Sequence, residues 1–256
     1  MPSDGIYLGM PALVHHLLVA FLVLVVPIWG RIEAAKLQRA RTPARKMRSY
    51  RRTIIWLWTA TILLLLTTPF AQLWRPPSIG VIEAWRTSPG GWSVMAGVAV
   101  GLAIGVFAFA SMSIIAARRN PEVRRQMQKS LEQVEFLLPR TTRERAWFTA
   151  VALSAGICEE IIFRGFLIRY VDALPIGVGV GASIVIAALI FGLDHGYQGV
   201  RGFIVTTVVA LVMSAIFFLA GALWLPMALH AAIDLRVLAL PSGEQEAVAA
   251  EAASPE

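Results

Sequence analysis

Two adjacent carboxylates and one guanidinium interrupt a long apolar run between positions 146 and 167, and these charged residues are Glu159, Glu160 and Arg164. A charge at the bilayer centre costs roughly 2.5 to 3.5 kcal/mol on insertion scales, so three in one segment require a purpose. On a helix, Glu160 and Arg164 are four residues apart and can pair, whereas Glu159 is turned about 100° away from Glu160. The spacing therefore predicts one paired carboxylate and a second, Glu159, that is available for chemistry.

Two further apolar stretches carry titratable side chains. Asp194 and His195 lie at the end of one, and His230 and Asp234 are four residues apart in the other, hence on one helical face. Ionisable side chains within membrane helices normally face the interior of a bundle. We therefore expect a cluster formed by Glu159, His195, His230 and Asp234.

This cluster contains the groups that several kinds of chemistry require. A desolvated glutamate such as Glu159 can act as general base on water, His195 can share that water, and His230 with a carboxylate partner can donate to a developing oxyanion. The same groups could instead bind zinc, through Glu159, His195 and His230. The chain contains no H-E-x-x-H and no G-x-S-x-G. The residues alone leave a hydrolase, a proton relay and a metal site open.

The composition indicates an all-α, polytopic membrane protein. Of 256 residues, 57% are hydrophobic and only 15% are charged, against about 25% charged in soluble domains. The net charge of +7 is concentrated in segments 31–52 and 118–145, which the positive-inside rule places in the cytoplasm. Nothing in the sequence resembles a nucleic-acid-binding motif, and the single cysteine excludes an intrachain disulfide.

Apolar runs of membrane-spanning length predict about seven transmembrane helices, with the N-terminus outside and the C-terminus cytoplasmic. An interfacial amphipathic helix is expected between Pro121 and Pro139. Three regions are expected: N-terminal membrane helices with a basic cytoplasmic loop (residues 1–120), a membrane core that carries the polar motifs (121–240) and a disordered tail (241–256). The predicted spans are 8–29, 53–73, 92–117, one that begins near 145, 176–195, 203–220 and 222–240.

Three local expectations concern how these helices begin, end and pack. Gly97, Gly101 and Gly105 are four residues apart and predict a close helix contact. Segment 75–91, rich in proline and glycine, is expected to be an external loop. Thr142 could cap an early start of the fourth helix, which would bring Glu159 to the level of His195.

The three polar motifs, in this order, resemble those of the CPBP family, the CAAX proteases and bacteriocin-processing (Abi) intramembrane endopeptidases. The motifs are Glu159-Glu160-x-x-x-Arg164, Phe191-x-x-x-His195 and His230-x-x-x-Asp234, and the resemblance covers roughly residues 137–240. It implies that Glu159 and His195 activate water, that His230 and Asp234 stabilise the oxyanion, and that Glu160, Arg164 and Phe191 support the site. The family often has Asn where this chain has Asp234.

The resemblance implies a hydrolase, a CAAX prenyl protease 2-like glutamic or metallo-endopeptidase of a bacterial plasma membrane. It would act on membrane-associated, prenylated or other peptide substrates, with the lipid bilayer as its surroundings and no nucleic acid as partner. No cofactor is certain, and Zn²⁺ remains open. Two other functions remain: a non-catalytic scaffold or bacteriocin self-immunity protein, and a transporter or proton relay.

Overall fold

The computed structural model describes residues 10–39, 42–120, 122–123, 125–126, 129 and 134–239. Within these residues every regular element is a helix and no strand occurs, which confirms the all-α prediction. In chain order the elements are α1 (Met10–Ala20), η1 (Phe21–Val25), α2 (Val26–Arg39), α3 (Pro43–Thr67), α4 (Phe70–Trp74), α5 (Gly80–Thr87), α6 (Gly91–Arg119), η2 (Glu135–Leu137), α8 (Thr142–Glu159), η3 (Glu160–Leu167), α9 (Ile168–Asp172), α10 (Gly179–Asp194), η4 (Gly196–Gln198), α11 (Gly199–Ala220), α12 (Trp224–Leu235) and η5 (Arg236–Ala239).

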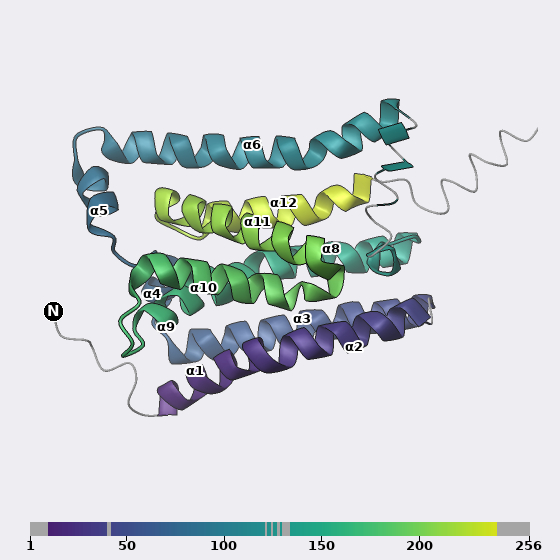
Figure 1. Cartoon of the computed structure of the whole chain (residues 1–256), viewed down its shortest axis with the longest axis horizontal. Coiled ribbons are helices and arrows are strands. Elements are labelled where there is room, and N and C mark those ends of the chain that lie inside the picture. Colours follow the sequence, from purple (N-terminus) through teal and green to yellow (C-terminus); the bar gives the residue numbers. More distant parts are fainter. Residues whose placement is uncertain are drawn as a thin grey trace, which may run out of the picture.

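The helices form a bundle with the C-terminal helices in its interior. Figure 1 shows α6 along one edge and α1 to α3 along the opposite edge, with α8, α10, α11 and α12 between them. Helix α8 packs against α3 and α12, and α10 packs against α11. The most continuous core of buried apolar side chains therefore surrounds α8, η3 and α10, the elements on which the sequence places two of its polar motifs.

The protein is an integral membrane protein, and three helical segments are long and apolar enough to cross a membrane: Ala12–Arg39, Gly91–Ala117 and Gly196–Ala220. The shorter Gly179–Asp194 helix is also apolar. The predicted count of seven spans is thus not confirmed. The first helix continues well past the predicted end at residue 29, because α2 runs to Arg39.

Two boundaries differ from the predictions. The predicted span 53–73 is interrupted at Thr68, whose backbone is extended (φ −134°, ψ 132°), because a residue that precedes a proline disfavours the helical conformation. The expected loop 75–91 contains a helix, α5. The expected amphipathic helix and the tail 241–256 lie largely or wholly outside the described residues; near Pro139 the chain forms only the short 3-10 helix η2.

The glycine prediction for α6 is wrong. An added Cβ at Gly97, Gly101 or Gly105 would meet no atom within 4 Å, so these glycines face away from the bundle. The buried face of α6 is instead formed by alanines, Ala99 and Ala103, which pack near α11 and α12. Both residue types are small, and the spacing alone could not show which face is buried.

The start of α8 is fixed by a network of polar contacts. The cap is Thr141, not Thr142: its backbone is extended (φ −107°, ψ 159°), and its hydroxyl accepts the Glu144 N–H at 3.2 Å. The Glu144 carboxylate accepts the Arg140 N–H at 2.8 Å and pairs with the buried Lys46 ammonium at 3.0 Å. These contacts tie the start of α8 to α3.

Candidate functional site

The helix that begins as α8 continues without a break into a π-helical segment, η3, which carries Glu160 and Arg164. Their side chains are fully buried and pair at 3.0 Å, as the spacing predicts. Arg164 also donates to the Ala210 carbonyl at 3.4 Å, and its guanidinium lies 4.8 Å from the Phe191 ring centre. Local π-helical turns are frequent at functional sites, and buried charges require such partners.

Glu160 has a second partner that the sequence did not indicate. Its Oε1 atom lies 2.7 Å from His230 Nδ1. Because the carboxylate already accepts from Arg164, His230 Nδ1–H is the donor. The other ring nitrogen, Nε2, lies 3.8 Å from Glu159 Oε2 and 3.8 Å from Asp234 Oδ2. Glu160 therefore fixes the orientation of the imidazole and leaves Nε2 between two carboxylates.

His195 is held in a similar way at the end of α10. Its Nδ1–H donates to the Phe191 carbonyl at 2.8 Å, and the two rings stack with their centres 4.4 Å apart. The Phe191 ring also contacts His230, with a separation of 6.2 Å between ring centres. This aromatic ring thus lies next to both imidazoles, and in each of them Nδ1 is occupied and Nε2 is the nitrogen left for chemistry.

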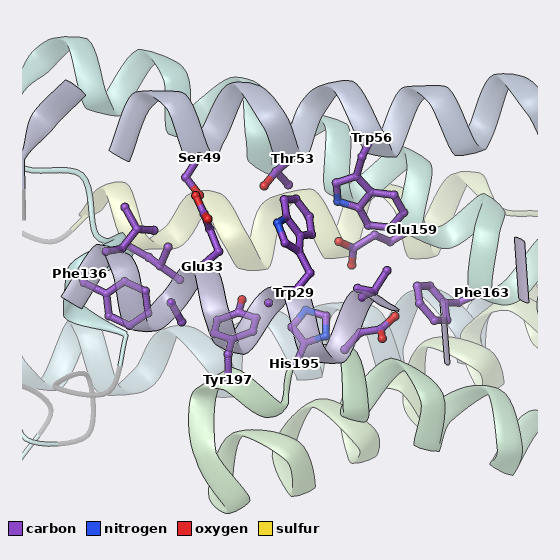
Figure 2. Close-up of a pocket in the computed structure, with 16 residues that line it drawn as sticks. Trp29, Glu33, Ser49, Thr53, Trp56, Phe136, Glu159, Phe163, His195 and Tyr197 are labelled. Carbon is purple, nitrogen blue, oxygen red and sulfur yellow. The ribbon is translucent and has the colours of Figure 1, made fainter. Parts of the chain in front are cut away.

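A cavity of about 150 Å³ contains the exposed part of this site. Glu159 and His195 both line it, whereas His230 and Asp234 are not among its lining residues. Figure 2 shows Glu33 and Phe136 toward one end of the cavity and Glu159 and Phe163 toward the other. The cavity therefore brings Glu159 and His195 together. His230 joins them through its 3.8 Å approach to Glu159, and Asp234 lies 3.8 Å from His230.

Half of the cavity wall comes from a part of the chain in which no motif was found. Trp29 and Glu33 of α2 and Thr53 and Trp56 of α3 line it. The one signal available in the sequence was Glu33, a single acid within a segment of many basic residues. Nothing in the sequence indicated the two tryptophans.

Close contact between α8 and α12 sets the position of His230. A Cβ added to Gly156 would lie 2.8 Å from both Cβ and N of Ala231, the residue next to His230. No side chain larger than hydrogen fits there without a shift of one helix. Gly156 lies one turn before Glu159 and Glu160, so this contact determines how near His230 comes to the two carboxylates.

The side chains do not fit a zinc site as arranged. Among the residues that the structure describes, no three His, Cys, Asp or Glu side chains converge as metal ligands. His230 Nδ1 is occupied by Glu160, so this imidazole offers only Nε2.

Two histidines and several carboxylates lie together inside a bundle of apolar helices, an arrangement whose chemistry suits proton transfer or hydrolysis. Residues 141–236 match the family model of type II CAAX prenyl endopeptidase Rce1-like proteins. This match confirms the resemblance to the CPBP family over that segment, and it indicates a membrane protease of the CAAX protease type. No curated protein and no solved structure matches the chain.

Proposed function

We propose that the protein is an intramembrane endopeptidase that hydrolyses peptide bonds of membrane-associated, prenylated or other peptide substrates with water activated by Glu159 and His195. The observation that carries the proposal is that Glu159 and His195 line one cavity while Glu159 also lies 3.8 Å from His230. The proposed base, a cavity beside it and the proposed oxyanion donor are thus adjacent.

In the first step water attacks the scissile carbonyl and its proton passes to Glu159. The Glu159 Oε2 atom is buried and has no hydrogen-bond partner among the described residues, so it is free to accept that proton. The neutral Nε2 of His195 accepts a second hydrogen bond from the water. The attack forms the C–O bond and places the carbonyl electron pair on the oxygen.

In the second step the tetrahedral intermediate collapses. His230, as an imidazolium held by Glu160 at Nδ1, donates Nε2–H to the oxyanion, and Asp234 lies beside it, with Oδ2 3.8 Å from the same nitrogen. The C–N bond then breaks, Glu159 returns its proton to the leaving amine, and the carboxyl product forms. Arg164 and Phe191 position these groups and do not touch the substrate.

The proposal extends to the localisation and membrane topology of the protein. The enzyme lies in a bacterial plasma membrane with its N-terminus outside and its C-terminus in the cytoplasm, as the two basic segments 31–52 and 118–145 favour. Its partners are the lipid bilayer and membrane-associated peptides or proteins. The cavity beside basic residues of α2 and α3 would then be reached from the cytoplasmic half.

The test is cleavage of a quenched fluorescent peptide panel, including a prenylated peptide, by purified protein in detergent with and without a chelator. We expect the wild type to cleave and Glu159→Gln and His230→Ala to lose at least about 100-fold in kcat. Full activity in the presence of the chelator is expected for water activated by Glu159 and His195.

Glu83→Gln is the matched control, because Glu83 is an exposed acid of α5 that pairs with Arg86 and lies outside the cavity lining. It should retain wild-type activity. A folded Glu159→Gln protein with unchanged turnover would overturn the assignment of the base. A folded wild type that cleaves no peptide would favour the non-catalytic scaffold instead.

A further inference from the structure

The described lining of the cavity is acidic. Three carboxylates line it, those of Glu33, Glu159 and Asp194, and no Lys or Arg side chain is among its described lining residues. A C-terminal carboxylate bound there would face like charges. The lining therefore selects against an anionic group and favours a cationic one.

Asp194 is one of the two cavity carboxylates that the catalytic steps do not use, and unlike Glu33 it has no ion-pair partner among the described residues. It is 9% exposed, and neither of its carboxylate oxygens has a hydrogen-bond partner among the described residues. It also ends α10, where the helix dipole disfavours a negative charge. Burial of a carboxylate is costly unless a partner compensates it, and no side chain among the described residues donates a hydrogen bond to Asp194. A ligand that brings a positive charge would supply that compensation.

The neighbouring charges do not neutralise this end of the cavity. Glu33 pairs with Arg52 at 3.5 Å, but the Arg52 side chain is half exposed and is not among the lining residues. The Arg31 guanidinium lies beside Gly196, 3.3 Å from an added Cβ, and is not a lining residue either. The acidic character of the cavity is thus retained next to two surface arginines.

Aromatic rings complete the lining. Trp29, Trp56 and Tyr197 face the cavity from three different elements, and all three are labelled in Figure 2. Tryptophan faces attract Lys and Arg side chains by cation–π interaction, and the apolar stems of these side chains pack well on such rings. Carboxylates and aromatic rings together are the chemistry that recognises an alkylammonium or guanidinium group.

We propose that this cavity binds a Lys or Arg side chain of the substrate close to the scissile peptide bond, with Asp194 as its principal partner. The proposal rests on the peptidase function and narrows its substrates to peptides with a basic residue near the cleavage site. It makes Asp194 a specificity-determining residue, distinct from Glu159, which accepts the proton of the water.

Binding tests this independently of turnover. The probe is a dye-labelled peptide with a reduced scissile bond, made in three forms that carry lysine, norleucine or glutamate next to that bond. Fluorescence anisotropy with the full chain in nanodiscs would give each Kd. We expect the lysine peptide to bind at least about tenfold more tightly than the norleucine peptide, and the glutamate peptide to bind least.

Asp194→Asn is the test variant because it preserves shape and removes the charge. Asp194→Asn should abolish most of the difference in Kd between the lysine and norleucine peptides, whereas Glu83→Gln should preserve that difference. Equal Kd values for the three peptides in the wild type, or an unchanged preference in a folded Asp194→Asn protein, would overturn the proposal. Displacement of the lysine peptide by phosphocholine would also overturn it, by assigning the cavity to a lipid headgroup.

The cleavage panel then separates the two proposals. Turnover of peptides without any preference for a basic residue would leave the peptidase function standing and remove the basic specificity. Tighter binding of the lysine peptide without turnover of any peptide would support the basic specificity of the cavity and remove the peptidase function. An Asp194→Asn protein that does not fold is replaced by Trp56→Leu, which removes a cation–π partner and should weaken binding of the lysine peptide only.

Discussion

His230 Nδ1 lies 2.7 Å from Oε1 of Glu160, and the same carboxylate oxygen pairs with Arg164 at 3.0 Å. One buried oxygen thus links η3 to α12 and orients the imidazole. The family motif places Glu160 in a supporting role, and the geometry makes it the residue through which two motifs are connected.

Loss of this link should reduce catalysis more than binding. Glu160→Gln retains an acceptor oxygen but removes the negative charge that stabilises the imidazolium of His230. We expect kcat to fall by about 10- to 100-fold with little change in KM, and the alkaline limb of the pH–rate profile to move to lower pH. A purely structural role would reduce the amount of active protein and leave the pH profile of the remainder unchanged.

Removal of the partner guanidinium should destabilise the fold. Arg164→Ala leaves the fully buried Glu160 carboxylate without its salt bridge, which costs about 3 to 5 kcal/mol for buried pairs. The folded yield and the thermal unfolding midpoint would both decrease. Arg125→Ala breaks an exposed pair with Glu122 and should change stability by less than about 1 kcal/mol; equal behaviour of the two variants would contradict the prediction.

The contact between Gly156 and Ala231 gives a steric prediction with an internal control. Gly156→Ala places a Cβ 2.8 Å from the Ala231 backbone nitrogen, and overpacking of this kind costs about 1 to 3 kcal/mol. It should also lower kcat, because α12 must move away from Glu159. Gly101→Ala on α6 meets nothing within 4 Å; it should leave kcat unchanged and should not lower the unfolding temperature, because alanine favours the helix over glycine.

A titratable group beside the start of α8 predicts a dependence of stability on pH. Burial, and then the charge of Glu144, raise the pKa of Tyr50 above its ordinary value of 10.0. Tyr50 precedes the predicted span 53–73, and its hydroxyl donates to the Leu137 carbonyl. The folded chain holds the phenol proton more tightly than the unfolded chain, so this contribution is complete below pH 10 and is lost as the pH rises further.

The measurement is the difference in unfolding temperature between the wild type and Tyr50→Phe across this pH range. Below pH 10 the wild type should be more stable by about 1 kcal/mol, and the difference should shrink as the pH rises above that value. A difference that stays constant across the range would contradict the assignment to the Tyr50 hydroxyl.

Asp234 offers a test of its proposed role at the oxyanion. A carboxylate can only accept hydrogen bonds, whereas an amide can donate. Asp234 Oδ2 lies 3.8 Å from His230 Nε2 with a partly exposed side chain. Asp234→Asn should therefore retain or increase kcat, and Asp234→Ala should decrease it. A loss of activity in both variants alike would indicate that the negative charge itself is required.

The sequence predicted the helical class and the residues of the three polar motifs because both depend on local spacing. The Glu160–Arg164 pair follows from a separation of four residues on one helix, and it is observed. The separate environment of Glu159 follows from the same geometry. The roles assigned to Glu159, His195, His230 and Asp234 stay predictions until turnover is measured.

Features that depend on which helices meet were not predictable. The Glu160–His230 contact joins residues 70 positions apart, and several carboxylates were equally available as partners for His230. The buried face of α6 could not be assigned from Gly97 and Gly101, because alanines repeat with the same period. Trp29 and Trp56 line the cavity only because α2 and α3 pack beside the site, and the sequence of these two helices carries no motif that indicates this packing.

The shared cavity wall has an evolutionary consequence. Glu159 and His195 come from the segment that matches the protease family, whereas Trp29, Glu33 and Trp56 come from outside it. In the proposed enzyme, substitutions in α2 and α3 would therefore alter which peptides enter while the groups proposed for hydrolysis stay untouched. A chimera that exchanges these two helices with those of a related protein would transfer substrate preference and keep the chemistry, so the two properties can diverge at independent rates.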